Sequence, residues 1–71
     1  MQPQEQWKYV EGTNRYYKRV EKRERRLFLI VGADADEPPS YWFAVYHQGE
    51  EITQGEGLSS IKEAQEAAEA V

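Results

Sequence analysis

The chain has 71 residues, no cysteine, one histidine and a formal net charge of −4. A chain of this length forms one small core and buries only about 60% of the surface that its unfolded form exposes, so residues 1–71 are expected to form a single small domain. The lack of cysteine excludes disulfides and thiolate metal sites and favours a reducing, cytoplasmic location. The polar N-terminus and a longest apolar run of only Leu27 to Val31 predict neither secretion nor membrane insertion.

The charges are distributed unevenly along the chain. Residues 15–26 hold seven basic and two acidic side chains, whereas residues 34–71 hold nine acidic side chains and the single base Lys62. Such blocks can attract a charged partner, or they can neutralise each other within one fold or between two copies of it.

The N-terminal third contains an edge-strand candidate and an ambiguous segment. Residues 7–10 are a possible edge strand that ends at the Gly12-Thr13-Asn14 turn. The segment from Asn14 to Arg26 alternates like a strand in its first half but also has the composition of a charged helix. Two adjacent tyrosines favour a strand, which a short connection would join to the next strand as a meander. A helix here would instead leave a three-stranded sheet.

The next two strands are better defined. Arg25 to Gly32 is predicted as a strand, followed by the exposed connection ADADEPPS. Tyr41 to His47 is the clearest strand, and the Gln48-Gly49-Glu50 turn joins it as a hairpin to a shorter strand around Ile52.

Alternation places the apolar residues of residues 25–32 on both faces of the sheet. Leu27, Leu29 and Val31 point one way, and Phe28 and Ile30 point the other. One helix covers only one of these faces. The second face must then be covered by the N-terminal segment, by another copy of the chain or by a partner.

The chain is predicted to end in a helix over residues 60–71. The Gly55-Glu56-Gly57 turn precedes it, and Ser60 with Glu63 forms a capping box. Its apolar face is mostly alanine, which lets the helix lie close to the bulky strand residues; that face consists of Ile61, Ala64, Ala68 and Val71. The predicted fold class is α+β, an antiparallel β-meander of three to five strands packed by one C-terminal α-helix.

The residues that would support catalysis are sparse. His47 has no evident acidic or nucleophilic partner, and no glycine-rich phosphate loop is present. Asp34, Asp36 and Glu37 lack the spacing of a calcium loop and are interpreted as a solvated acidic loop. We therefore expect no enzyme activity, no cofactor, no metal site and no small-molecule substrate.

The candidate binding site is the basic aromatic stretch within residues 15–26, together with one ring from the aromatic strand Tyr41 to His47. Its members combine phosphate-seeking charge with rings on which bases could stack; they are Tyr16, Tyr17, Lys18, Arg19, Lys22, Arg23, Arg25, Arg26 and Trp42. The calculated pI near 4.9 argues against nucleic acid, because nucleic-acid binders are usually basic overall. The alternative interpretation is a solvated strand and turn whose bases pair with Glu21, Glu24 and the acidic helix.

The last third of the chain resembles the repeat unit of the YegP-type family of small bacterial proteins. The residues at matching positions are Gly49, Glu50, Ile52, Glu56, Gly57, Ser59, Ser60 and Val71. Departures are Gln48 for an asparagine, Leu58 for a tyrosine and Ile61 for a lysine, which put any role of those side chains in doubt. The resemblance implies a β-β-β-α unit, often carried in tandem, in a family without an established role.

The functional expectation is a non-catalytic protein-interaction module. It includes the case of a homodimeric small regulatory or phage-type protein, because a second copy would cover Phe28, Ile30 and the aromatic strand. The alternative is nucleic-acid binding through residues 15–26.

Overall fold

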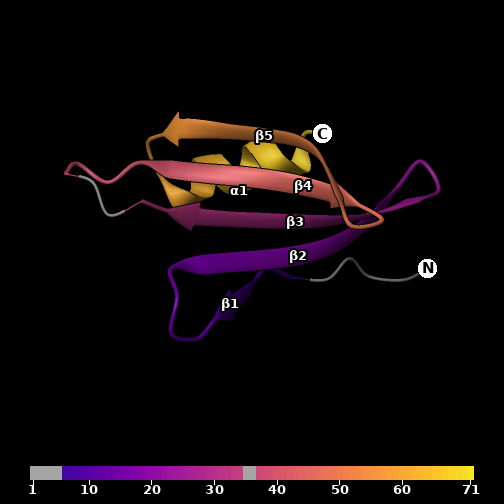
Figure 1. Cartoon of the computed structure of the whole chain (residues 1–71), viewed down its shortest axis with the longest axis horizontal. Coiled ribbons are helices and arrows are strands. Elements are labelled where there is room, and N and C mark those ends of the chain that lie inside the picture. The colour runs from indigo at the N-terminus through magenta and orange to yellow at the C-terminus, as the bar shows by residue number, and fades with distance from the viewer. Residues whose placement is uncertain (1–5, 35–36) are drawn as a thin grey trace.

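The computed structural model describes residues 6–34 and 37–71. They form a five-stranded antiparallel sheet in sequential order and one helix (Figure 1). The elements are β1 (Lys8–Val10), β2 (Arg15–Lys22), β3 (Arg25–Ala33), β4 (Tyr41–His47), β5 (Glu50–Leu58) and α1 (Ile61–Glu69). This arrangement confirms the predicted α+β meander with one C-terminal helix.

The ambiguous segment is a strand, as favoured. β2 pairs with β3 from Arg15 opposite Gly32 to Lys22 opposite Arg25, and the two strands are joined by Arg23 and Glu24 alone. Both turn residues have positive φ angles, 54° and 63°, which is the backbone of a type I′ hairpin turn. The predicted edge strand is present as β1, so residues 8–10 extend the sheet rather than covering one of its faces.

The predicted turn at Gly55-Glu56-Gly57 is wrong. These residues belong to β5, which runs nine residues to Leu58, whereas only a shorter strand around Ile52 was predicted. The glycines suggested a turn because they permit unusual backbone angles, and Gly57 does have a φ of +74°. Here they belong to a bulged strand end, and the ring of Phe43 lies over Gly55.

The helix begins where it was predicted and ends two residues earlier. Ser60 is its N-cap, and the Ser60 hydroxyl accepts a hydrogen bond of 3.0 Å from the backbone N–H of Glu63. The carboxylate of Glu63 accepts a hydrogen bond from the hydroxyl of Ser59. Val71 lies beyond the helix and is 38% exposed. The prediction that Val71 belongs to the packed face of the helix is therefore wrong.

The core lies between α1 and one face of the sheet. Ala64 and Ala68 are buried against β3 and β4, and their small side chains let the helix approach the sheet closely. The strand side of this core consists of Leu27, Leu29, Val31 and Val45. The predicted alternation of β3 is therefore confirmed, with Phe28 and Ile30 only half-buried on the opposite face.

One face of the sheet has no element over it among the described residues. Figure 1 shows α1 behind β3, β4 and β5, and no described segment crosses in front of them. We call this surface the open face, and it is the side of the sheet that carries Phe28 and Ile30. No helix in residues 6–34 and 37–71 is long and apolar enough to cross a membrane.

Candidate functional site

The alternation of β2 divides the basic aromatic stretch between the two faces of the sheet. Tyr16 and Lys18 lie opposite the buried residues Val31 and Leu29 of β3, so they face the helix side. Lys22 also faces this side, since its ammonium reaches the helix. The predicted site therefore does not form one continuous surface.

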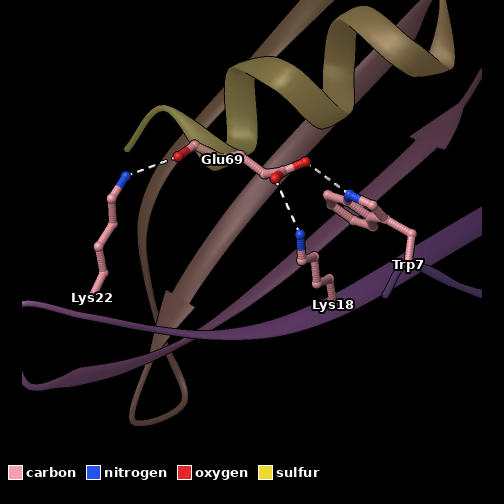
Figure 2. Close-up of polar contacts among 4 residues, drawn as sticks. All are labelled: Trp7, Lys18, Lys22 and Glu69. Carbon is pink, nitrogen blue, oxygen red and sulfur yellow. Dashed lines mark hydrogen bonds and ion pairs between the residues drawn. The ribbon is translucent and has the colours of Figure 1, made fainter. Parts of the chain in front are cut away.

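On the helix side, two lysines and a tryptophan converge on the end of α1 (Figure 2). The indole Nε1 of Trp7 donates a hydrogen bond of 2.9 Å to Glu69 Oε1, and Lys18 Nζ forms an ion pair of 3.1 Å with Glu69 Oε2. Lys22 Nζ donates to the backbone carbonyls of Glu69 and Val71, at 2.8 and 2.5 Å. These contacts satisfy carbonyls that a helix C-terminus leaves without partners.

The ion pair between Lys18 and Glu69 is largely removed from solvent on the lysine side. The side chain of Lys18 is only 9% exposed and that of Glu69 is 41% exposed. A buried ammonium is costly without a partner, so Glu69 supports the burial of Lys18. The hydrogen bond from Trp7 lowers the pKa of Glu69, with a further lowering from Lys18 that partial burial opposes. Lys18 and Lys22 thus connect β2 to the helix, and both ammonium groups are engaged there.

The open face carries a continuous group of aromatic side chains. The rings of Tyr17 and Phe28 are stacked, with centroids 5.7 Å apart, and those of Phe28 and Tyr46 are tilted, with centroids 6.4 Å apart. These half-buried rings span β2, β3 and β4, and Ile30 lies directly opposite Tyr17. Such a surface combines apolar area with hydroxyl groups, which is typical of binding faces.

Trp42 extends this group toward the far end of β3. It lies opposite Gly32, and a Cβ atom at Gly32 would come within 2.5 Å of the indole ring. The guanidinium carbon of Arg15 lies 5.6 Å from the centre of the Trp42 ring, within cation–π range. Gly32 therefore leaves room for the ring of Trp42, and the ring in turn holds Arg15.

The two edges of the open face differ in charge. Arg19 in β2 lies opposite Phe28, and Glu51 in β5 lies opposite Tyr46, so one row across the sheet reads basic, aromatic, aromatic, acidic. Lys8 and Arg15 add positive charge on the β1 and β2 side. The asymmetry in the sequence thus reappears as opposite charges at opposite edges of one surface.

The remaining predicted residues lie apart from this surface or at its end. Arg23 is in the hairpin turn, and Arg25 is opposite Lys22 on the helix side. Arg26 is on the open face and forms an exposed ion pair of 3.4 Å with Glu21. Of the nine predicted binding residues, the open face therefore brings together Tyr17, Arg19, Arg26 and Trp42.

A separate groove lies on the helix side, beyond the edge of the helix. It has a volume of about 510 Å³ and is lined by Tyr9, Asn14, Tyr16, Ala33, Asp34, Glu37, Pro39, Tyr41 and Ile61. His47 is not among its lining residues. Within residues 6–34 and 37–71, no three histidine or carboxylate side chains gather in a way that could hold a metal ion, and Asp36 of the acidic loop lies outside the described residues.

Several residues of the open face were not in the predicted site. Phe28 and Ile30 were assigned to this face by alternation alone, but Arg15, Tyr46 and Glu51 join it through strand register. Register depends on the hairpin turns that join β2 to β3 and β4 to β5, which the sequence indicates only in part.

Comparison with protein-family models, with curated proteins and with solved structures finds no match. The resemblance of residues 49–71 to the YegP-type family stays a prediction.

Proposed function

We propose that the protein is a non-catalytic protein-interaction module that binds through the open face and self-associates into a homodimer. The observation that carries this proposal is the group of Tyr17, Phe28, Ile30 and Tyr46, half-buried on a sheet face that no described element covers. Apolar surface of this kind is stabilised when a second surface removes it from water.

The size of the open face is consistent with a reversible interface. With strands about 4.8 Å apart and about 3.3 Å per residue, four strands of seven residues present roughly 450 Å² of planar area. Stable interfaces usually bury about 800 Å² of accessible surface per partner, and weak ones bury less. We therefore expect a reversible dimer whose population depends on protein concentration.

Binding of single-stranded nucleic acid is a second candidate for the same surface. The contact between Arg15 and the Trp42 ring, beside the rings of Tyr17 and Phe28, is an arrangement on which bases could stack. The cations available on this surface favour nucleic-acid binding less than self-association. Lys18 and Lys22 are engaged at the helix and Arg26 is paired with Glu21. Of the four other cations in residues 15–26, only Arg15 and Arg19 lie on the open face, where they could meet phosphates.

The solution mass of the protein, measured by light scattering from about 1 μM to about 500 μM, tests the proposal. We expect a rise from monomer to dimer, which the variant I30K abolishes because it places an ammonium at the centre of the open face. Tyr17→Lys, nearer the edge, is a second variant in case I30K fails to fold. Tyr9→Lys is the matched control, because Tyr9 is 52% exposed and faces the helix side.

The same series is repeated at low salt with a mixed-sequence single-stranded oligonucleotide. A chain that stays monomeric throughout the concentration range contradicts the homodimer proposal. A monomer whose mass rises with the oligonucleotide, and falls again with added salt, favours the second candidate instead.

A further inference from the structure

We propose that the two copies pack open face to open face around a two-fold axis that runs parallel to the strands, between β3 and β4. This inference rests on the proposed self-association and specifies its geometry. It is carried by the strand register and by the opposite charges at the two edges of the open face.

The position of the axis decides which strands of the two copies face each other. Rotation about a line between β3 and β4 places β3 over β4 of the other copy, and β2 over its β5. A rotation of this kind adds no translation along the strands, so each row of residues across the sheet meets the same row of the partner. Sheets packed in this way lie about 10 Å apart with strand directions within about 30° of each other.

This geometry creates charged pairs between the two copies. Arg19, Phe28, Tyr46 and Glu51 occupy one row across β2 to β5. Under the proposed axis, Arg19 lies over the partner's Glu51, and Glu51 lies over the partner's Arg19. Their combined side-chain length spans the roughly 10 Å between packed sheets. Two equivalent ion pairs therefore form at the edges of each dimer.

Apolar side chains meet between the two charged pairs. Phe28 lies over the partner's Tyr46, which extends the aromatic contact already present within one copy. In the neighbouring row Ile30 lies over the partner's Ala44, so a large side chain meets a small one. The centre of the interface is then apolar and the charges lie at its rim, as in most protein interfaces.

Two other two-fold arrangements are opposed by charge. An axis perpendicular to the strands at the level of Tyr17 places β2 over β2 of the partner, which brings Arg15 and Arg19 of one copy against the same two arginines of the other. Pairing edge to edge through β5 would bring together strands that each carry Glu50, Glu51 and Glu56. Of these three arrangements, the axis parallel to the strands is the one that sets Arg19 of one copy against Glu51 of the other.

The test exploits the symmetry of the proposed pair. In R19E both ion pairs of the homodimer become carboxylate pairs, and in Glu51→Arg both become pairs of guanidinium groups. We expect each single variant to raise the dimer Kd by roughly tenfold or more, because like charges then face each other twice. The double variant R19E/E51R is expected to return to within about threefold of the unsubstituted chain.

The most specific result comes from mixing the two single variants. In a dimer of R19E with E51R, both contacts join opposite charges, so two chains that self-associate poorly are expected to form a heterodimer of near-original affinity. Sedimentation velocity at moderate salt with one variant fluorescently labelled measures this directly. R25E and Glu50→Arg are matched controls, because they make the same charge changes at Arg25 and Glu50, whose register partners Lys22 and His47 place them on the helix side.

The outcomes separate the geometry from the proposed function. Recovery in the double variant and in the mixture supports the proposed axis. A dimer that forms in the unsubstituted chain but shows neither recovery overturns the axis and leaves the homodimer standing. A chain that does not dimerise at any concentration overturns the homodimer itself, and the axis with it.

Discussion

Lys18 illustrates how one side chain can meet a sequence pattern and still lie outside the function that the pattern suggests. It belongs to a run of bases that resembles a nucleic-acid binding stretch, yet its ammonium is buried and paired with Glu69, 51 residues further along the chain. Successive side chains of a strand alternate, so Lys18 and Arg19 of β2 point to opposite faces. Which face the helix covers follows from packing, and this is why the sequence alone did not exclude Lys18 and Lys22.

The contact between Glu69 and its partners predicts a pH dependence of stability. Because folding lowers the pKa of Glu69 below its ordinary value of 4.5, the carboxylate contributes stability above that value and loses it as the pH falls through the lowered pKa. We expect Glu69→Gln to lower the free energy of unfolding at pH 7 by about 1 kcal/mol and to flatten its decline in acid. Urea unfolding at a series of pH values measures both effects.

Glu66→Gln is the control for this prediction, since Glu66 is an exposed acid on the same helix. An equal loss of stability and an equal change of acid dependence in the two variants would show that the contacts of Glu69 with Trp7 and Lys18 contribute nothing specific.

At the scale of elements, local chemistry was enough to place the start of the helix, whereas the bounds of the strands depend on pairing. The helix was placed correctly at its start because Ser60 caps it locally. The extent of β5 was underestimated, because pairing with β4 and the ring of Phe43 over Gly55 keep a glycine-rich segment in the sheet. The strand favoured within residues 14–26 is confirmed over residues 15–22, each of which pairs with β3.

The turn between β2 and β3 predicts a stabilising substitution. Arg23 and Glu24 both have positive φ angles, a backbone conformation that costs free energy for residues other than glycine and asparagine. Replacing them together, as R23N/E24G, supplies the preferred pair for this turn without changing the net charge. We expect the free energy of unfolding to rise by about 1 kcal/mol in urea titrations. Unchanged or lower stability would mean that the side chains of Arg23 and Glu24 stabilise the hairpin more than the backbone angles cost.

The close packing of α1 predicts a second effect at this scale. Ala64 is fully buried against the sheet, so Ala64→Leu has no space for its added carbon atoms. Overpacking of this kind is expected to lower the free energy of unfolding by about 1 to 3 kcal/mol. Ala70→Leu makes the same change at an exposed position and is expected to have little effect. Equal stability of the two variants in thermal unfolding would contradict the close approach of α1 to β3 and β4.

At the scale of the whole molecule, the fold leaves one sheet face apolar, aromatic and uncovered by described elements. The sequence predicted two apolar faces on β3 and one helix that covers only one of them, and the structure assigns the helix to the face of Leu29 and Val45. The sequence alone could not predict that Arg19 and Glu51 lie in one row, because this depends on the register of three strand pairs. That row underlies the proposed geometry of a dimer.

The most direct test of the account is an NMR dilution series that follows individual methyl groups. If the open face covers itself in a second copy, the Ile30 methyl resonances shift with protein concentration, and those of Leu29 and Val45 beneath the helix stay fixed. The shifts at different open-face residues should fit one dimer Kd and disappear in I30K for the remaining residues, such as Ala44. Resonances that do not change between about 10 μM and about 1 mM, or that change only on the helix side, would contradict binding through the open face.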